Sequence, residues 1–316
     1  MSSNVTAPTF RSLPAAPPAV PADWPVDAGL LAALLTEQHP TFAGLPIRPM
    51  GEGWDNAVFL VGDDLVCRLP RRAAAIPLME NELRWMGLLG PRLPLPTSAP
   101  CLEGRPSARF GAPWSGARLI RGQTADRCPA EPSAATLALS AFLRALHQPA
   151  PPEAPINPVR GIRAHQRRPT VERLAGIAPP GLLDRWAGWS SRPAPPGPPR
   201  WCHGDLHPRN LIVQEGQLVG VIDWGDLTAG WPAVDLGAAL LGLPQAHWSA
   251  FFAAYAEGAT LPDETVAESL AWTTVFALLL YDAGLSAADP FFRSIGEAAL
   301  AGLMADPIGA ALAKAP

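Results

Sequence analysis

Lysine is almost absent from this sequence: of its 24 basic residues, only Lys314 is a lysine. Asparagine occurs five times and tyrosine twice in 316 residues, whereas alanine, proline and arginine abound. This bias is typical of a GC-rich coding sequence and says nothing about the fold. It does make an asparagine that stands in a motif more informative, because the background supplies so few of them.

Charge of either sign is also scarce, since Asp, Glu, Lys and Arg together make up 16% of the residues. The net charge is −4 and the isoelectric point about 5.9, so the basic surplus of a constitutive nucleic-acid binder is missing. Charges or prolines interrupt the apolar runs, so the sequence predicts no membrane span. It also lacks a basic stretch followed by an apolar one, so it predicts no signal peptide. We therefore expect a cytoplasmic protein with no nucleic-acid or membrane partner.

The four cysteines are widely spaced, and no two of them form a C-x-x-C pair. This spacing argues against a structural zinc site and against a disulfide framework. We expect reduced thiols, some of them buried as small apolar residues. The four are Cys67, Cys101, Cys128 and Cys202.

A chain of 316 residues is long for one compact domain, so one large domain or two lobes is expected. Residues 1–24 lack a periodic apolar pattern and predict a flexible tail. Residues 25–120 predict a helix, short strands and an acid-bearing helix. Residues 121–316 predict mostly helices with one embedded hairpin, and their Pro- and Arg-rich stretch 148–200 is expected to be a partly mobile insertion. The fold class predicted is α+β in two lobes.

The segment around residue 205 carries the sharpest chemical signal. It reads H-x-D-x-x-x-x-N over His203, Asp205 and Asn210, and Asp223 follows at the end of the predicted hairpin. Kinases have the same order of a catalytic Asp, an Asn and a second Asp. A loop Asp can accept a proton from a hydroxyl, while Asn and Asp oxygens suit Mg²⁺. We interpret Asp205 as the catalytic group, His203 as the residue that orients it, and Asn210 and Asp223 as the magnesium ligands.

Other interpretations stay open at this point. His203, Asp205 and His207 could form a zinc cluster, but the four remaining histidines supply no second cluster. His207 could act either near phosphates or on the loop backbone. A protein kinase is disfavoured because no A-P-E segment follows Asp223. A catalytically silent nucleotide-binding module and a kinase of a metabolite, such as an amino alcohol or a sugar, remain as alternatives.

The run H-G-D-L-H-P-x-N from His203 to Asn210, followed by I-D-W-G-D and then by W-P-A-V-D-L, resembles the aminoglycoside phosphotransferase family. That family also includes macrolide, choline and homoserine kinases. The resemblance extends over residues 45–300 and implies a protein-kinase-like fold with a small strand-rich N-lobe, 25–120, and a larger helical C-lobe, 121–316. It also implies a Mg²⁺-dependent kinase that uses ATP or GTP and modifies a small molecule, as in antibiotic resistance.

The resemblance assigns roles in the N-lobe as well. Gly51 and Gly53 would cover the phosphates, and Arg68 stands where the family has its phosphate-clamping Lys, which is a departure. Arginine can hold phosphate oxygens through paired hydrogen bonds. Glu82 is favoured over Glu80 as the carboxylate that orients this clamp. Ile120 and Gly122 would form the hinge whose backbone meets a purine.

Charge is distributed unevenly along the chain. Residues 229–316 hold nine acidic and two basic side chains, a net charge of −7, against +3 for residues 1–228. Acidic helices that wall an acceptor cleft would favour a cation. The sequence therefore predicts an amine-bearing acceptor, such as an aminoglycoside or a macrolide, although solvated helix faces would give the same count.

Overall fold

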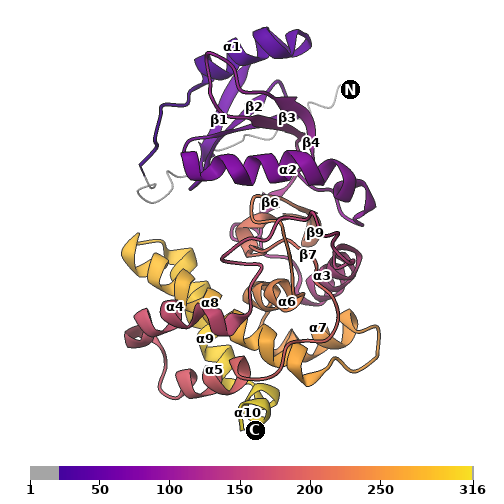
Figure 1. Cartoon of the computed structure of the whole chain (residues 1–316), viewed down its shortest axis with the longest axis vertical. Helices are drawn as coiled ribbons and strands as arrows, with labels where there is room; N and C mark the ends of the chain where they lie inside the picture. The colour runs from indigo at the N-terminus through magenta and orange to yellow at the C-terminus, as the bar shows by residue number, and fades with distance from the viewer. Residues whose placement is uncertain (1–20, 315–316) are drawn as a thin grey trace, which may run out of the picture. The chain divides into compact units, whose positions relative to one another are not determined.

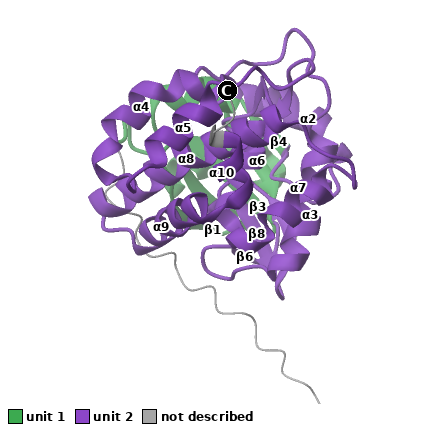
Figure 2. Ribbon diagram, turned by 90° about the horizontal axis from the view of Figure 1, so that it is seen from below, with its two compact units in different colours: residues 1–79, 101–119 green, residues 80–100, 120–316 purple. Residues whose placement is uncertain are grey.

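A computed structural model describes residues 21–314 of the chain. The chain divides into two compact units, one made of residues up to 79 and 101–119, the other of residues 80–100 and 120 onward (Figure 2). This division differs from the predicted one, because residues 80–100 group with the second unit. The chain passes from the first unit to the second between Leu119 and Ile120, one residue from the expected boundary.

The first unit is built on a five-stranded sheet with the strand order β1-β2-β3-β5-β4 (Figure 1). The pairs β1–β2, β2–β3 and β3–β5 are antiparallel. In β2 the apolar residues Ala57, Phe59 and Val61 are buried, and Phe59 stands opposite Cys67 of β3. Trp114 of β5 is fully buried in the same core. The strands are β1 (Ile47–Glu52), β2 (Asn56–Val61), β3 (Leu65–Pro70), β4 (Pro100–Gly104) and β5 (Trp114–Arg118).

Helix α1 (Ala28–Gln38) packs its leucine stripe against this core, with Leu31 and Leu34 fully buried. Asp27 caps the helix, because its carboxylate accepts a 2.7 Å hydrogen bond from the amide of Leu30. Most of the predicted tail lies outside the described residues. At its end, however, the indole of Trp24 donates to the carbonyl of Pro70 at 2.9 Å, so this residue belongs to the folded unit.

The second unit is mainly helical and confirms the predicted α+β class, since a strand-rich unit precedes a helix-rich one. A hairpin of β8 and β9 and a short β10–β7 pair are embedded among the helices. The helices are α2 (Ile76–Leu89, whose first turn belongs to the first unit), α3 (Pro132–Leu146), α4 (Arg168–Arg173), α5 (Leu182–Ser190), α6 (Ala233–Ala239), α7 (Trp248–Tyr255), α8 (Asp263–Ser286), α9 (Pro290–Ala305) and α10 (Pro307–Lys314). The strands are β6 (Gln123–Thr124), β7 (Arg200–Cys202), β8 (Leu211–Gln214), β9 (Gln217–Val221) and β10 (Thr228–Gly230).

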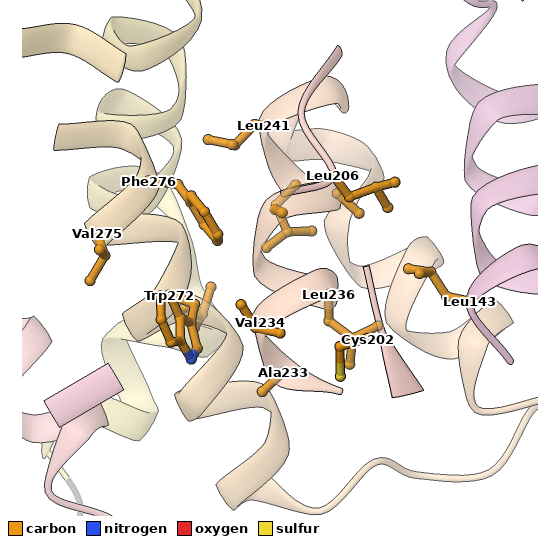
Figure 3. Packing of buried hydrophobic residues seen from close by; sticks show 14 of the residues in the cluster. Leu143, Cys202, Leu206, Ala233, Val234, Leu236, Leu241, Trp272, Val275 and Phe276 are labelled. Atoms are coloured by element: carbon orange, nitrogen blue, oxygen red, sulfur yellow. The ribbon is translucent and has the colours of Figure 1, made fainter. Parts of the chain in front are cut away.

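Helix α8 forms the centre of this unit. It is long and apolar enough to cross a membrane, but 61% of its most apolar window is buried, as in the core helix of a globular domain. Its buried hydroxyls bond to its own backbone: Thr273, for example, donates to the carbonyl of Ser269 at 2.9 Å. Figure 3 shows Trp272 of α8 with Leu236 of α6 and Leu206 among the side chains of the buried cluster.

The expectation that residues 148–200 form a partly mobile insertion is wrong. The segment contributes α4 and α5 to the second unit, and Val171, Trp186 and Trp189 are buried in its core. The segment is rich in proline and arginine and has few large apolar residues, so its composition alone does not indicate that it packs into the core. Trp189 is fully buried, and its indole donates to the carbonyl of Gly309 at 2.8 Å, which ties α5 to α10.

Candidate active site

The predicted catalytic residues lie on the loop between β7 and β8, in the second unit. Asn210 ends this loop in a short 3₁₀ turn, Pro208–Asn210, and its side-chain amide donates to the carbonyl of Asp205 at 2.8 Å. The amide of Ile222 donates to the carbonyl of Asn210 at 2.9 Å. The hairpin therefore returns Asp223 to the same end of the loop, and the structure brings Asp205, Asn210 and Asp223 together.

A buried carboxylate fixes the backbone of the loop. Asp235, in the first turn of α6, is fully buried and accepts hydrogen bonds from the amides of His203 at 2.7 Å and Gly204 at 2.8 Å. The Nε2 atom of His147 lies 3.1 Å from the same carboxylate, and its Nδ1 lies 2.8 Å from the hydroxyl of Tyr255. Because two amides and an imidazole converge on Asp235, the loop has little freedom to shift.

His147, Cys202 and Asp235 also form a group whose ligand atoms lie within 4.8 Å of one another. A metal would have to displace the hydrogen bonds that already occupy His147 and Asp235. Burial and the charge of Asp235 raise the pKa of the Cys202 thiol well above its usual range, despite the opposing charge of Arg200. Since metal binding requires the thiolate, we interpret this group as a hydrogen-bonded support of the loop and not as a metal site.

His203 orients the catalytic aspartate from behind. Its ring is fully buried, and its Nε2 lies 3.0 Å from the carbonyl of Ile222, so that nitrogen carries the proton. The other nitrogen, Nδ1, then accepts from the amide of Asp205 at 3.2 Å. Trp224 packs against the ring at a centroid distance of 4.6 Å. An orienting role for His203 stays our interpretation of this arrangement.

Asp205 is held between the side chains of Arg160 and His207. The Nη2 atom of Arg160 lies 3.1 Å from its Oδ1, the Nε2 of His207 lies 3.4 Å from its Oδ2, and 24% of the side chain is exposed. Burial alone would raise the pKa of Asp205, but the charges of His207 and Arg160 together with the hydrogen bond from His207 hold it well below the usual range. The carboxylate is therefore ionised and partly open.

His207 serves the loop backbone as well, because its Nδ1 accepts a hydrogen bond from the amide of Arg209 at 3.2 Å. Arg209 in turn pairs with Asp126 at 3.0 Å and with Asp289, at the start of α9, at 2.7 Å. Its guanidinium also lies 3.9 Å from the ring centroid of Phe292. These contacts fasten the Asn210 end of the loop to α9 and to the segment after β6.

Three carboxylates gather at the site. Burial and the charges of Asp205 and Asp223 raise the pKa of Asp226, although Arg160 and a hydrogen bond from Asn157 oppose the shift. Asp223 is exposed and has a φ of 63°, a left-handed conformation in which its amide faces the hydroxyl of Ser98 at 3.3 Å. The carboxylate of Asp223 and the amide oxygen of Asn210 are hard donors, so this set fits Mg²⁺.

Gly204 is a required glycine in this arrangement. Its φ is 87°, and an added Cβ would lie 2.5 Å from the carbonyl oxygen of Asp226. Any other residue would push the catalytic loop away from the segment that follows Asp223. The glycine of the H-G-D motif therefore permits the close approach of these two parts of the site.

The proposed phosphate-binding residues lie in the first unit. The amide of Gly53 donates to the carbonyl of Asn56 at 2.9 Å, which closes the turn that follows Gly51. Arg71 holds this turn from the side through the carbonyl of Gly53 at 3.1 Å and the carboxylate of Glu52 at 3.0 Å. Arg68 lies on the central strand β3 and is buried, with 8% of its surface exposed.

Glu82, Ile120 and Gly122 group with the second unit. On α2, Glu82 is buried and Glu80 is exposed, which supports the choice between them. Ile120 packs against Gly220 of β9, and a Cβ on Gly122 would lie 2.7 Å from the carbonyl oxygen of Val213. The predicted hinge thus runs tightly along the β8–β9 hairpin, which lies between Asn210 and Asp223 in the sequence.

Sequence reasoning missed Asn157 and Arg160. Asn157 donates from its side chain to Asp226 at 2.7 Å and accepts from the amide of Arg160 at 3.1 Å. Both residues lie in the segment that was interpreted as an insertion. One signal was available, because Asn157 is one of only five asparagines in the chain.

The acidic surplus of residues 229–316 is largely neutralised in the structure. Asp235 and Glu268 are fully buried with partners, and the buried Asp289 and Asp306 accept hydrogen bonds from backbone amides at the starts of α9 and α10. Glu257 pairs with Arg144 at 3.2 Å, and Asp282 pairs with Arg173 at 3.3 Å. A count of charges along the sequence therefore overstates the negative potential that an acceptor would meet.

Solved structures share this fold. The GDP complex of aminoglycoside 2'-phosphotransferase-IIIa is 21% identical at a TM-score of 0.67, covering 87% of this chain and 98% of that one. Macrolide 2'-phosphotransferase MphH from Brachybacterium faecium is 22% identical at a TM-score of 0.58, covering 85% and 97%. A choline/ethanolamine kinase family protein from Mesorhizobium loti is 20% identical at a TM-score of 0.56, covering 90% and 98%. These likenesses establish the fold.

Comparison with curated protein sequences gives no match. The phosphotransferase enzyme family, in contrast, matches residues 46–270, which include both the glycine turn and the whole catalytic loop. The matched range takes in the residues that converge on Asp205 and extends into α8. The chain therefore belongs to the phosphotransferase enzyme family.

Proposed function

We propose that this protein is a Mg²⁺-dependent kinase that transfers the γ-phosphoryl group of ATP or GTP to a hydroxyl of a small molecule. One observation carries the proposal: an ionised, partly exposed Asp205 is fixed beside Asn210 and Asp223 by a buried support. A scaffold that only bound nucleotide would have no need to hold this carboxylate so firmly. Reduced thiols and the need for a nucleotide suit a cytoplasmic enzyme.

In the proposed reaction Asp205 orients the acceptor hydroxyl and takes its proton. A bond forms between the acceptor oxygen and the γ-phosphorus, the bond from that phosphorus to the β–γ bridging oxygen breaks, and the nucleoside diphosphate departs. Arg160 and His207 lower the pKa of Asp205, so this carboxylate is a weak base and receives the proton late. Late proton transfer is consistent with the loose transition state of phosphoryl transfer.

The metal site would be formed by Asn210 and Asp223. Magnesium, when bound there, would neutralise charge on the phosphate oxygens. The side-chain amide nitrogen of Asn210 is committed to the carbonyl of Asp205, so its amide oxygen is the atom that would face the cation. The loop thus links the position of a metal ligand directly to that of the catalytic carboxylate.

For the nucleotide, we propose that the turn at Gly51 and Gly53 covers the phosphates and that Arg68 binds them, oriented by Glu82. The backbone at Ile120 and Gly122 would meet the purine. The similar structures include a GDP complex of aminoglycoside 2'-phosphotransferase-IIIa and a streptomycin–ATP complex of APH(2")-IIa, which supports a purine nucleotide as donor.

For the acceptor, an amine-bearing antibiotic stays our first candidate. Similar structures are described as complexes with kanamycin and gentamicin, and others as macrolide 2'-phosphotransferases. Less unpaired negative charge is available to attract an amine than the sequence suggested, because most acids of residues 229–316 have partners. The acceptor panel should therefore include neutral sugars, amino alcohols and hydroxy acids.

The decisive experiment measures transfer of labelled γ-phosphate from ATP and from GTP to such a panel, with Mg²⁺ and with a chelator. We expect transfer to at least one hydroxyl compound with Mg²⁺ and none with the chelator. Nucleotide that binds but is never consumed with any acceptor would identify the chain as a catalytically silent module.

A further inference from the structure

A basic cavity of about 350 Å³ lies in the second unit and is not used by the proposed reaction. Three guanidinium groups, an imidazole and two hydroxyls surround it, and none of the described residues that line it carries a carboxylate. The lining residues are Arg163, His165, Arg168, Ser190, Ser191 and Arg192. A cavity of this size accommodates a small organic molecule or one anionic group of it.

The positive charge of this cavity is only partly compensated. Arg163 has a close carboxylate, Glu268, at 2.7 Å, but its Nε atom is buried without a hydrogen-bond partner. Arg168 meets Glu172 at 3.8 Å on an exposed surface, where such a pair contributes little. The guanidinium of Arg192 donates to the carbonyl of Leu312 at 2.9 Å and 3.2 Å. Of the three guanidinium groups, only that of Arg163 therefore has a close carboxylate partner among the described residues, and the cavity keeps a net positive charge.

The segment that lines this cavity also reaches the catalytic aspartate. Arg160 contacts Asp205 at 3.1 Å, and Arg163 follows three residues later. Because consecutive Cα atoms are about 3.8 Å apart, the Cα atoms of Arg160 and Arg163 lie within about 11 Å of each other. Arg167, between the cavity residues His165 and Arg168, has its pKa lowered by burial and by the charge of Arg160. Positive charge therefore continues from the catalytic carboxylate to the cavity.

We infer that this cavity binds an anionic group, a phosphate or a carboxylate, of a small molecule. Guanidinium groups hold both anions through charge-assisted, often paired, hydrogen bonds. The anion could belong to the acceptor itself, which rests on the proposed function, or to a separate ligand of the same chemistry. In the first case the acceptor would carry both a reactive hydroxyl and an acidic group, and a polyamine has no acidic group.

The binding test uses inorganic phosphate as the probe, titrated calorimetrically at constant ionic strength. The variant is Arg168→Gln combined with His165→Gln, because both side chains are exposed and neither belongs to the catalytic machinery. Arg173→Gln is the matched control, since it removes one arginine from the same helix outside the cavity. We expect phosphate affinity to fall at least fivefold in the double variant and to stay within twofold of wild type in the control.

Equal phosphate affinity in all three proteins, with circular dichroism confirming that each is folded, would overturn the proposal. So would an equal loss in the control, because that would reflect net charge and not a site. Arg192→Gln gives a second, independent removal of one guanidinium and should weaken phosphate binding in the same direction. None of these readouts needs turnover, so a failure of the proposed function would leave the binding result interpretable.

Kinetics then separate the two sources of the anion. If the acceptor supplies it, phosphate inhibits competitively against a phosphorylated or carboxylated acceptor, and the double variant raises KM for that acceptor with little change in kcat. If a separate ligand supplies it, phosphate acts without competing with the acceptor. If the acceptor supplies the anion, the double variant should leave KM unchanged for a hydroxyl acceptor that has no acidic group.

Discussion

Asp235→Ala tests whether the buried support positions the active site. The substitution leaves the amides of His203 and Gly204 buried without an acceptor, where they now have hydrogen bonds of 2.7 Å and 2.8 Å. Each buried donor that loses its partner costs about 1 to 3 kcal/mol, so the free energy of unfolding should fall by about 2 to 6 kcal/mol. With a urea m-value of about 3 kcal/mol per M, the midpoint falls by about 0.7 to 2 M.

In the Asp235→Ala variant, kcat should fall by more than the loss of folded protein would explain. The two amides immediately precede Asp205, and a displacement of about 1 Å at a reacting group can cost about 100-fold in rate. We therefore expect kcat to drop by about that factor in protein that is still folded, while KM for nucleotide changes little. Urea titration followed by tryptophan fluorescence, together with steady-state kinetics at a temperature where the variant is folded, measures both effects.

Asp282→Ala is the matched control, because it removes a carboxylate from an exposed pair with Arg173 at 3.3 Å. Pairs of this kind contribute about 0 to 1 kcal/mol, so its midpoint should stay near that of the wild type. If Asp235→Ala is as stable and as active as this control, the carboxylate does not position the loop and the reasoning fails.

Three further results are expected. Asp205→Asn should reduce kcat by about 100-fold or more while nucleotide affinity, measured by calorimetry, persists; more than a tenth of the wild-type rate would contradict its role as the base. Asp223→Ala should weaken binding of magnesium nucleotide itself, and unchanged affinity in the same titration would remove Asp223 from the metal site. In native protein at pH 8, iodoacetamide should modify the exposed Cys101 and spare Cys67, since burial and the neighbouring Cys101 raise the pKa of the Cys67 thiol to about 12; mass spectrometry of tryptic peptides reads the outcome.

The catalytic hairpin could be predicted from the sequence because its residues are neighbours along the chain. Asp223 lies thirteen positions after Asn210, and a tight hairpin brings such close segments of strand together. Arg160 is different, because it lies 45 positions before Asp205 and the residues between them carry no pattern that fixes their pairing. Contacts across such a distance depend on how α4 and α5 pack, which no local periodicity encodes.

Charge was the least predictable property of the site. The sequence shows that Glu268 and Asp235 are acidic. It does not show that Arg163 pairs with Glu268, or that two backbone amides donate to Asp235, in the core. The potential that a ligand meets depends on which charges stay unpaired. For the same reason the basic cavity around Arg163 could not be anticipated, because its arginines all lie in the stretch 148–200, which the sequence led us to interpret as a partly mobile insertion.

The contacts of Arg209 have a consequence for cooperativity. This side chain joins the catalytic loop to Asp126 and to Asp289, segments separated by 163 positions in the sequence. Fraying of the first turn of α9 would therefore release a contact that holds the loop carrying Asp205 and Asn210. In hydrogen exchange, the amides of Phe291 and Phe292, which donate to Asp289, should open together with those of the catalytic loop. Local unfolding near the end of the chain would thus register as a loss of order at the reaction centre.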